Sequence, residues 1–345
     1  MPLVAHNNLP SFDRLRAEGR TVLNPQRANS QEIREMHIGL LNMMPDKALE
    51  ATERQFLRLI GESNQIAQFY VHPFTLPQLE RGDDAKAYID EHYDTFEDLK
   101  EQGLDALIIT GANVGQADLT CEPFWEPLQE VMDWAWNHVA STICSCLATH
   151  AVMQFKYGQA REARGEKLWG VYKHRVTDRG HPLVKGMNTS FDAPHSRFNR
   201  ISTAQFAEAN MKVLAESDVA GVHMAVSPDG FRLLCFQGHP EYDTISLHKE
   251  YKRELARYEA GELSNKPPYP EAYYDADLIA RLDAAQSCDA MNDSDFEDLL
   301  ENTWRDSART VIGNWVGQVY QTTNVDRTKQ FMDGVDPDDP LGLKA

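Results

Sequence analysis

The segment STICSCLATH, residues 141–150, places a cysteine where a strand signal gives way to a helix signal. Residues 139–145 form an apolar run of strand length, and residues 147–157 have the apolar spacing of a helix. A sharp turn between them would expose Cys146 above a sheet edge and aim the next backbone N–H groups, beginning with Leu147, at the same point. A helix N-terminus also favours the thiolate over the thiol. Cys146 is therefore a candidate nucleophile, and the alternative is a buried cysteine that only packs.

Strand and helix signals alternate along the chain on both sides of this turn. The predicted strands are residues 38–45, 66–74, 105–110 and 139–145. The predicted helices are residues 48–60, 88–102, 122–138 and 147–157. This alternation predicts an α/β fold in which a mostly parallel sheet carries helices on both faces. Farther on, two apolar runs within residues 222–240 flank a Pro-Asp-Gly turn and predict a β-hairpin, and Asp243 is the expected N-cap of a helix over residues 243–258.

The segments outside this pattern differ in composition. Residues 1–35 are polar and broken by prolines, which predicts an arm that wraps around a single α/β domain of residues 36–325. Residues 262–303 contain adjacent prolines and then many acidic side chains, so we expect a surface excursion or a lobe that faces a partner. Residues 304–321 return to helical spacing, and residues 326–345 form a polar tail.

A second segment with chemical potential is FQGHPEYD, residues 236–243, which follows a hydrophobic strand directly. His239 and Glu241 would project from a constrained turn at the carboxyl end of that strand, where open α/β sheets place their active sites. A neutral histidine can take the proton of a thiol, and a carboxylate behind the histidine orients its ring. The three residues together predict a nucleophile, Cys146, with a base and its partner. The alternative for the pair is a surface histidine beside an acid.

Charge and composition narrow the class of protein. The 34 basic and 53 acidic residues give a formal net charge of −19, which argues against nucleic acid or an anionic membrane as a partner. No apolar run approaches the roughly 18 residues of a membrane helix, and the first residues lack the apolar segment of a signal peptide. The cysteines are odd in number and irregularly spaced: Cys121, Cys144, Cys146, Cys235 and Cys288. This pattern argues against a disulfide framework, and we expect a cytoplasmic protein.

Six motifs in order make the chain similar to a known family. They are LNMMPDK (41–47), LIITGA (107–112), EKLWGVYKHRV (166–176), FDAPHSR (191–197), GHPEYD (238–243) and NW…VYQ (314–321). Together with the cysteine turn they resemble the homoserine O-acyltransferase family of methionine synthesis, over about residues 30–325 apart from the acidic excursion. The resemblance implies a class I glutamine amidotransferase-like, flavodoxin-like fold.

The resemblance also implies a reaction. Cys146 matches the cysteine that accepts an acyl group from acyl-CoA, His239 matches the general base, and Glu241 matches its partner. Transfer would then be ping-pong, from the Cys146 thioester to the hydroxyl of L-homoserine, with the backbone N–H of Leu147 helping to hold the oxyanion. The family implies a homodimer, no metal, and no cofactor beyond acyl-CoA as co-substrate.

Four further residues match substrate positions of the family. Lys47 matches a lysine near the nucleophile, and Lys167 and Ser196 match substrate-binding positions. Arg253 matches the arginine that holds the homoserine carboxylate, a role that suits the parallel donors of a guanidinium. Without the family pattern, the three charged residues would be taken for solvated surface charges.

One glycine bears on the acyl donor. In the family, a glutamate four residues after the glycine of the TGA strand end goes with acetyl-CoA, and a glycine goes with succinyl-CoA. That position is Gly115 here. A glutamate would fill the pocket and repel the free carboxylate of a succinyl group, whereas glycine leaves room. The expected activity is therefore homoserine O-succinyltransferase. The alternatives are acetyl transfer, a glutamine amidotransferase-like hydrolase, a plain turn glycine at this position, and a non-catalytic binding protein.

The turn at Cys146 departs from the family pattern. Family members commonly show Cys-Trp-Gly/Ala-x-Gln, whereas this chain has Cys-Leu-Ala-Thr-His, ending at His150. His150 lies one helical turn after Cys146, so the two side chains could face each other. A metal site built from Cys144, Cys146, His150 and His239 is not expected, because their spacing is not that of a zinc site.

Overall fold

Eleven strands form one sheet within the described residues, 3–64, 66–285 and 292–344 of the computed structural model. The sheet order is β2-β1-β4-β3-β5-β6-β11-β10-β9-β7-β8. The parallel part comprises β2 (Val22–Leu23), β1 (Leu3–Val4), β4 (Gln68–Phe74), β3 (Glu35–Leu41), β5 (Ala106–Ile109), β6 (Ser141–Ser145) and β11 (Leu233–Phe236). The antiparallel extension comprises β10 (Gly221–Val226), β9 (Lys212–Ser217), β7 (Glu162–Val176) and β8 (Ser190–Arg200). The mostly parallel sheet and the β10–β11 hairpin are confirmed.

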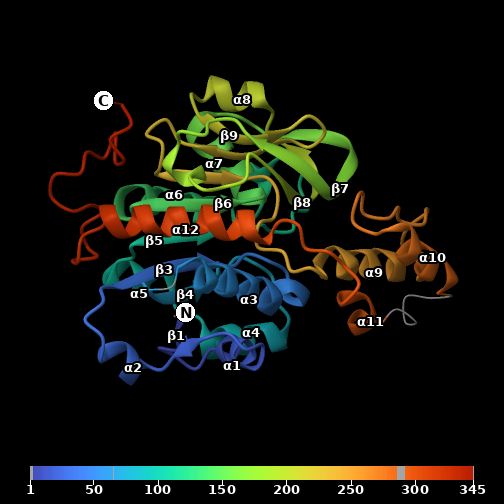
Figure 1. The fold of residues 1–345 in the computed structure, drawn as a ribbon, viewed down its shortest axis with the longest axis horizontal. Coiled ribbons are helices and arrows are strands. Elements are labelled where there is room, and N and C mark those ends of the chain that lie inside the picture. The colour runs from blue at the N-terminus through green and yellow to red at the C-terminus, as the bar shows by residue number, and fades with distance from the viewer. Residues whose placement is uncertain (1–2, 65, 286–291, 345) are drawn as a thin grey trace.

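Helices cover both faces of the sheet (Figure 1). Their bounds are α1 (Pro10–Ala17), α2 (Pro25–Asn29), α3 (Asp46–Ser63), α4 (Asp83–His92), α5 (Phe96–Gln102), α6 (Trp125–His138), α7 (Leu147–Tyr157), α8 (Thr203–Glu208), α9 (Ser246–Glu259), α10 (Ala276–Ala284), α11 (Asp293–Glu297) and α12 (Arg305–Thr322). Side chains of α1, α3 and α12 pack on one face, and those of α5 to α8 pack on the other. Within β5, Ile108 faces the first layer and Leu107 the second, as the two-residue period of a strand requires.

The order of the central parallel strands decides where the loops meet. Strands β4-β3-β5-β6-β11 follow the flavodoxin-like order, in which the second strand along the chain lies outside the first. The order in which successive strands join the sheet therefore reverses at β3 and β5, which are parallel, and the loops at the carboxyl ends of these two strands run to opposite faces. The loops after β6 and β11 end at the same edge, because these strands are parallel neighbours. The segments that carry Lys47, Gly115, Cys146 and His239 thus leave the sheet at one edge.

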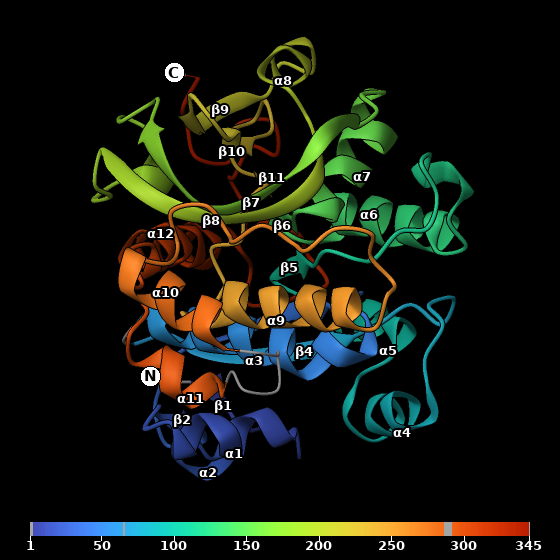
Figure 2. The ribbon, with the colours of Figure 1, turned by 90° about the vertical axis from the view of Figure 1, so that its right-hand side faces the viewer.

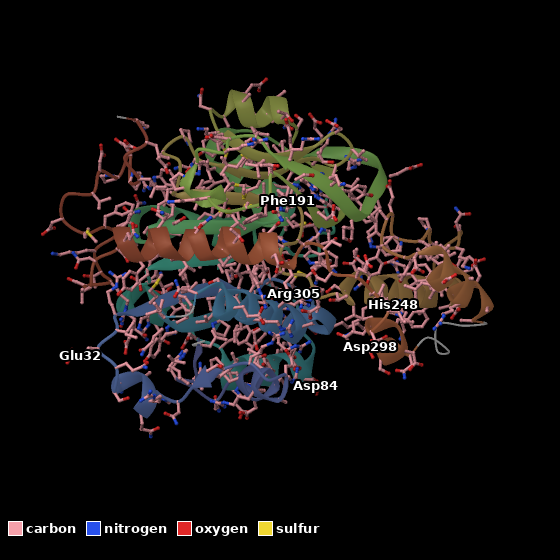
Figure 3. All side chains as sticks on the ribbon, viewed as in Figure 1. Glu32, Asp84, Phe191, His248, Asp298 and Arg305 are labelled. Atoms are coloured by element: carbon pink, nitrogen blue, oxygen red, sulfur yellow. The ribbon has the colours of Figure 1, made fainter. Side chains whose placement is uncertain are left out.

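The acidic excursion and the preceding helix α9 together form a small helical lobe with its own core. Helices α9, α10 and α11 project from one side of the sheet body (Figures 1 and 2). Their buried residues include Tyr251, Leu278 and Phe296, which form a cluster separate from the two sheet layers. His248 of α9, labelled in Figure 3, is buried and stacks on Phe296 with 4.6 Å between the ring centroids. Residues 286–291, with Cys288 and part of the acidic run, lie outside the described residues.

Two local predictions were wrong. The helix expected over residues 88–102 is two helices, α4 and α5, because Tyr93 and Thr95 are extended and the Thr95 side chain caps α5 by accepting from the Asp98 N–H. Asp243 does not cap α9, which begins after Ile245 with no side-chain cap. The Asp243 carboxylate binds Arg58 instead, since an arginine is a stronger partner than a helix N–H.

The N-terminal arm contributes more than a wrapping surface. Its strand β1 pairs with β4, and Phe12 and Leu15 of α1 are buried in the same core as α3 and α12.

The polar tail is anchored by Gln330, whose side chain donates to the main chain at the end of α6. Of the cysteines that are described, all four are free. Among the described helices, none has the length and apolarity needed to cross a bilayer.

Candidate active site

Cys146 occupies a strained turn between β6 and α7. Its backbone has φ 50° and ψ −107°, a conformation that a residue with a side chain rarely adopts. The Cys146 N–H donates to the Phe236 carbonyl of β11 at 2.7 Å, which ties the turn to the strand that leads to His239. The N–H of Thr149 donates to the Cys146 carbonyl at 3.0 Å, whereas those of Leu147 and Ala148 have no acceptor among the described residues and could hold an oxyanion. The strand-to-helix turn predicted at Cys146 is confirmed.

His239 lies between Cys146 and Glu241. Its Nδ1 is 2.8 Å from Oε1 of Glu241, and its ring forms a hydrogen bond with the Cys146 side chain. Burial alone would lower the pKa of His239, but the negative charges of Glu241 and of the Cys146 thiolate together raise it well above its usual value. A protonated His239 ring would stabilise a thiolate on Cys146, as in a thiolate–imidazolium pair. Such a pair holds a nucleophile ready and a proton beside it.

A chain of hydrogen bonds lies beneath the His239 turn. The Nε–H of Arg197 donates to Nδ1 of His195 at 3.3 Å, so His195 carries its proton on Nε2. That proton is donated to Nε2 of His174 at 3.2 Å, and Nδ1 of His174 donates to the Tyr172 carbonyl at 2.8 Å. Burial, with the Arg197 charge nearby, lowers the pKa of His195 well below its usual value and that of His174 to about 4. Both rings are therefore neutral.

His223 completes a buried group of three histidines with His174 and His195, whose nitrogens lie within 4.8 Å of one another. It is the one group of three potential metal ligands among the described residues, and it contains neither cysteine nor His150. A metal fits it poorly, because His195 Nε2 must keep its proton opposite Arg197. The backbone of Gly238 also fills the space: a Cβ there would lie 2.7 Å from Nδ1 of His223 and 2.8 Å from Nε2 of His195. The cluster instead supports the turn.

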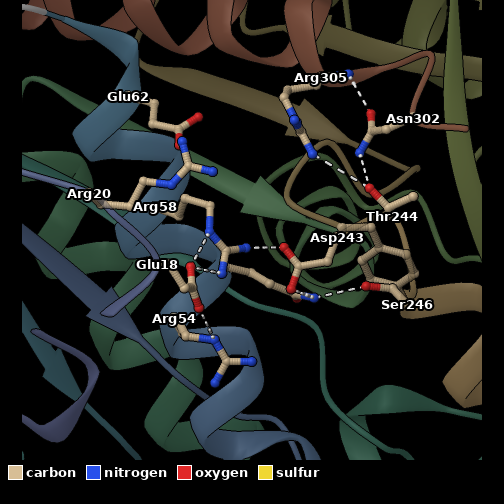
Figure 4. Close-up of polar contacts among 12 residues, drawn as sticks. Glu18, Arg20, Arg54, Arg58, Glu62, Asp243, Thr244, Ser246, Asn302 and Arg305 are labelled. Atoms are coloured by element: carbon tan, nitrogen blue, oxygen red, sulfur yellow. Dashed lines mark hydrogen bonds and ion pairs between the residues drawn. The ribbon is translucent and has the colours of Figure 1, made fainter. Parts of the chain in front are cut away.

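A network of ion pairs holds the turn of His239 and Glu241 on the side away from the histidine cluster (Figure 4). Arg58 of α3 binds Asp243, two residues after Glu241, and also binds Glu18 of the N-terminal arm at 2.7 Å. Glu241 is itself buried, and its Oε2 has no hydrogen-bond partner among the described residues. It lines a cavity of about 430 Å³ between α3, α12 and the turn. The turn that carries Glu241 is thus held at Asp243 by a helix and an arm that are distant in sequence.

A second polar cluster surrounds Glu250, a residue that none of the sequence motifs indicates. The Glu250 carboxylate accepts hydrogen bonds of 2.6 Å from Ser196 and from the Tyr242 hydroxyl, and Lys167 Nζ is 3.5 Å away. Burial alone would raise the pKa of Glu250, but Lys167 and the two hydroxyls lower it below its usual value. The Tyr242 ring stacks on His239 with 4.3 Å between the centroids, which joins this cluster to the Cys146 site.

The remaining predicted residues lie around these clusters. Arg253 is on α9 three residues after Glu250, is about half exposed and is 3.7 Å from Glu254. Glu250 lies one helical turn before Arg253, and this spacing is the sequence signal that could have identified Glu250 as a site residue. Lys47 is exposed in the first turn of α3, and no hydrogen bond or ion pair among the described residues joins it to Cys146 or His239. Gly115 is exposed in the loop after β5, where a Cβ would meet no described atom within 4 Å.

His150 does not face solvent or act as a second base. It is 2% exposed, and burial, with Arg197 and Arg161 nearby, lowers its pKa to about 3. A neutral buried ring one helical turn after Cys146 is a packing residue.

Comparisons with known proteins identify the family of the chain. The family model described as homoserine O-succinyltransferase matches residues 2–325. A homoserine O-succinyltransferase of Allochromatium vinosum is 59% identical over 99% of each chain, and one of Thiobacillus denitrificans is 60% identical over 99% of this chain and all of its own.

Solved glutamine amidotransferases show low overall similarity. The one from Thermotoga maritima is 8% identical, covers 82% of this chain and 98% of its own, and has a TM-score of 0.46. The one from Methylobacillus flagellatus is 13% identical, covers 83% and 95%, and has a TM-score of 0.45. The full-length identity and the family match, rather than these structures, confirm the resemblance drawn from the six motifs. The chain belongs to the homoserine O-succinyltransferase family.

Proposed function

We propose that this protein transfers the succinyl group of succinyl-CoA to the hydroxyl of L-homoserine, in methionine synthesis, through a thioester on Cys146. Its family membership supports the overall reaction. The observation that carries the mechanism is the hydrogen-bonded series Cys146, His239 and Glu241 at a strained turn. These groups supply a nucleophile, a proton carrier and a charge that stabilises the imidazolium.

The first half-reaction acylates the enzyme. The Cys146 thiolate attacks the thioester carbonyl of succinyl-CoA, and the negative charge that develops on the oxygen is held by the backbone N–H of Leu147. The tetrahedral intermediate collapses with cleavage of the bond to the CoA sulfur. His239 gives its proton to the departing CoA thiolate, so CoA leaves as the thiol and the ring becomes neutral. The product is a succinyl thioester on Cys146.

The second half-reaction moves the acyl group to the acceptor. The neutral His239 takes the proton of the homoserine hydroxyl as the oxygen attacks the thioester carbonyl. The bond to Cys146 breaks, and the thiolate and imidazolium of the resting enzyme are restored. No redox cofactor is needed, because no atom changes oxidation state, and we propose that none is used.

The acceptor is an amino acid that carries both charges at neutral pH. We propose that the Glu250 carboxylate binds the homoserine ammonium and that Arg253 binds the homoserine carboxylate. Their three-residue spacing on α9 puts both on one face of the helix. Tyr242 supports the placement, since it contacts both Glu250 and His239. Lys167 and Ser196 would position Glu250, and Lys47 remains a predicted neighbour of the nucleophile.

The test compares two donors. Purified protein with L-homoserine should release CoA from succinyl-CoA much faster than from acetyl-CoA, and mass spectrometry should find a succinyl group on Cys146 when homoserine is omitted. Cys146→Ala should fold and lose the transfer. Preference for acetyl-CoA would refute the Gly115 argument. Full activity of Cys146→Ala would refute the mechanism, and glutaminase activity without acyl-CoA turnover would favour a hydrolase.

The cellular compartment and the oligomeric state of the enzyme are predictions. We propose a cytoplasmic homodimer, on the basis of the family resemblance and, for the compartment, of the four free cysteines among the described residues. Sedimentation of the purified protein would measure its mass in solution and would contradict the homodimer if it found monomers at working concentration.

A further inference from the structure

The loop that carries Gly115 begins beside the nucleophile and ends at an arginine. A Cβ built on Gly111, at the start of the loop, would lie 3.6 Å from the Cβ of Cys146. At the other end, Nη2 of Arg161 donates to the carbonyls of Gln116 and Ala117, at 2.8 and 3.1 Å. Gly115 therefore lies between Cys146 and Arg161 along a short stretch of chain.

Arg161 has hydrogen-bonding capacity that the described protein does not use. A guanidinium has five N–H donors, and only those on Nη2 have acceptors here. Nε is buried without a partner, and Arg161 forms no ion pair with a carboxylate in the part of the chain that the structure describes. Glu122 and Asp118 are near enough to raise its pKa, as is Cys146, but burial dominates and lowers the pKa. A partly buried cation with spare donors is unusual in a chain with a net charge of −19.

Two other arginines near the site have partners of their own. Arg197 is buried, and its donors go to His195, Asn199 and Ala220. Arg200 forms an ion pair with Glu162 at 2.9 Å. The Nε of Arg164 also has no hydrogen-bond partner among the described residues, but no hydrogen bond joins Arg164 to the Gly115 loop there.

We propose that Arg161 binds the free carboxylate of the succinyl group while its thioester carbon is at Cys146. In a succinyl chain, three C–C bonds of about 1.5 Å separate the two carboxyl carbons, so the free carboxylate lies roughly 4 Å from the reacting carbon. The open space at Gly115 admits the chain, and the donors of Arg161 at the end of the loop meet its charge. The inference rests on the proposed function and identifies the group that gives it donor specificity.

Butyryl-CoA is the probe, because it has the length of succinyl-CoA with a methyl group in place of the carboxylate. We expect Arg161→Leu to lower kcat/KM for succinyl-CoA by about 100-fold, the loss typical of two charge-assisted hydrogen bonds, and to change kcat/KM for butyryl-CoA by less than about threefold. Arg161→Lys, which keeps the charge without the fork, should lose about tenfold with succinyl-CoA alone. Arg200→Leu, on the paired strand, is the matched control and should leave both donors unchanged.

The donor pair separates the specific role from a structural one. Equal losses with both donors would mean that Arg161 only anchors the loop, and would overturn the proposal. A loss selective for succinyl-CoA in Arg164→Leu or Lys47→Leu, with Arg161→Leu unaffected, would also overturn it. If the wild type used butyryl-CoA as well as succinyl-CoA, it would have no carboxylate receptor. If the wild type released CoA from neither donor, the proposed function itself would be wrong.

Discussion

Replacing Gly238 by alanine should disturb the catalytic turn without touching a catalytic side chain. The new Cβ would lie 2.7 Å from Nδ1 of His223, 2.8 Å from Nε2 of His195 and 2.8 Å from the Pro194 carbonyl oxygen. Ordinary contact begins at 3.4 Å, so each contact is 0.6–0.7 Å too short. His195 is held by hydrogen bonds to Arg197 and His174, and the Pro194 oxygen accepts from the His239 N–H. The turn that carries Gly238 and His239 should therefore move, rather than the hydrogen-bonded groups that the new Cβ would contact.

Two magnitudes follow for Gly238→Ala. Overpacking of a well-filled interior destabilises by about 1–3 kcal/mol, which would lower the melting temperature by several degrees. A displacement of His239 by several tenths of an ångström, away from Cys146 or Glu241, should lower kcat by about 10- to 100-fold, because misplacement by about 1 Å can cost about 100-fold. Since the acceptor cluster is around Glu250, KM for homoserine should change less than kcat.

The assay is steady-state CoA release together with thermal unfolding followed by calorimetry. Gly317→Ala is the matched control, because it lies in α12 where a Cβ would meet no described atom within 4 Å, and alanine is the better helix former. It should keep full activity and wild-type or higher stability. Wild-type kcat and melting temperature in Gly238→Ala would refute the reasoning, since they would show that the histidine cluster yields freely and does not position His239.

Three further outcomes are expected. Glu241→Gln removes the charge that most raises the pKa of His239, so an NMR titration should find that pKa lowered and kcat should fall by about 100-fold or more; an unchanged titration would contradict the pairing. Glu250→Gln should raise KM for homoserine by about 10- to 100-fold with a smaller effect on kcat, whereas a wild-type KM would remove Glu250 from the acceptor site. Burial lowers the pKa of His150 to about 3 and that of His174 to about 4, whereas an unfolded histidine has a pKa near 6.5. As the pH falls from about 6.5 to 4, the unfolded state therefore binds protons before the folded state does. The free energy of unfolding should fall over this range by up to about 1.4 kcal/mol per pH unit for each ring. Urea unfolding across that range measures it, and His150→Gln should flatten the slope; a stability that rises on acidification would contradict the assignment.

Some features of this protein follow from the sequence alone, because they depend on local patterns. The alternation of strand and helix signals predicts the parallel sheet, and the positions of Cys146 and His239, each just after a strand, predict that they meet at one sheet edge. These predictions succeed because parallel neighbouring strands must end at the same edge. The family motifs indicate the reaction, and they also predict the substrate residues, which stay a prediction.

Other features were decided only by the tertiary structure. Glu250 had no motif of its own, and it gains its place from Ser196 and Tyr242, which come from a different strand and turn. Asp243 looked like a helix cap from its neighbours in sequence, yet Arg58, 185 residues away, binds it more strongly. The arm similarly enters the core through β1. A periodic pattern records which face of an element is apolar, but it does not record which distant charge will arrive beside a given side chain, and such long-range pairs decide the polar part of this site.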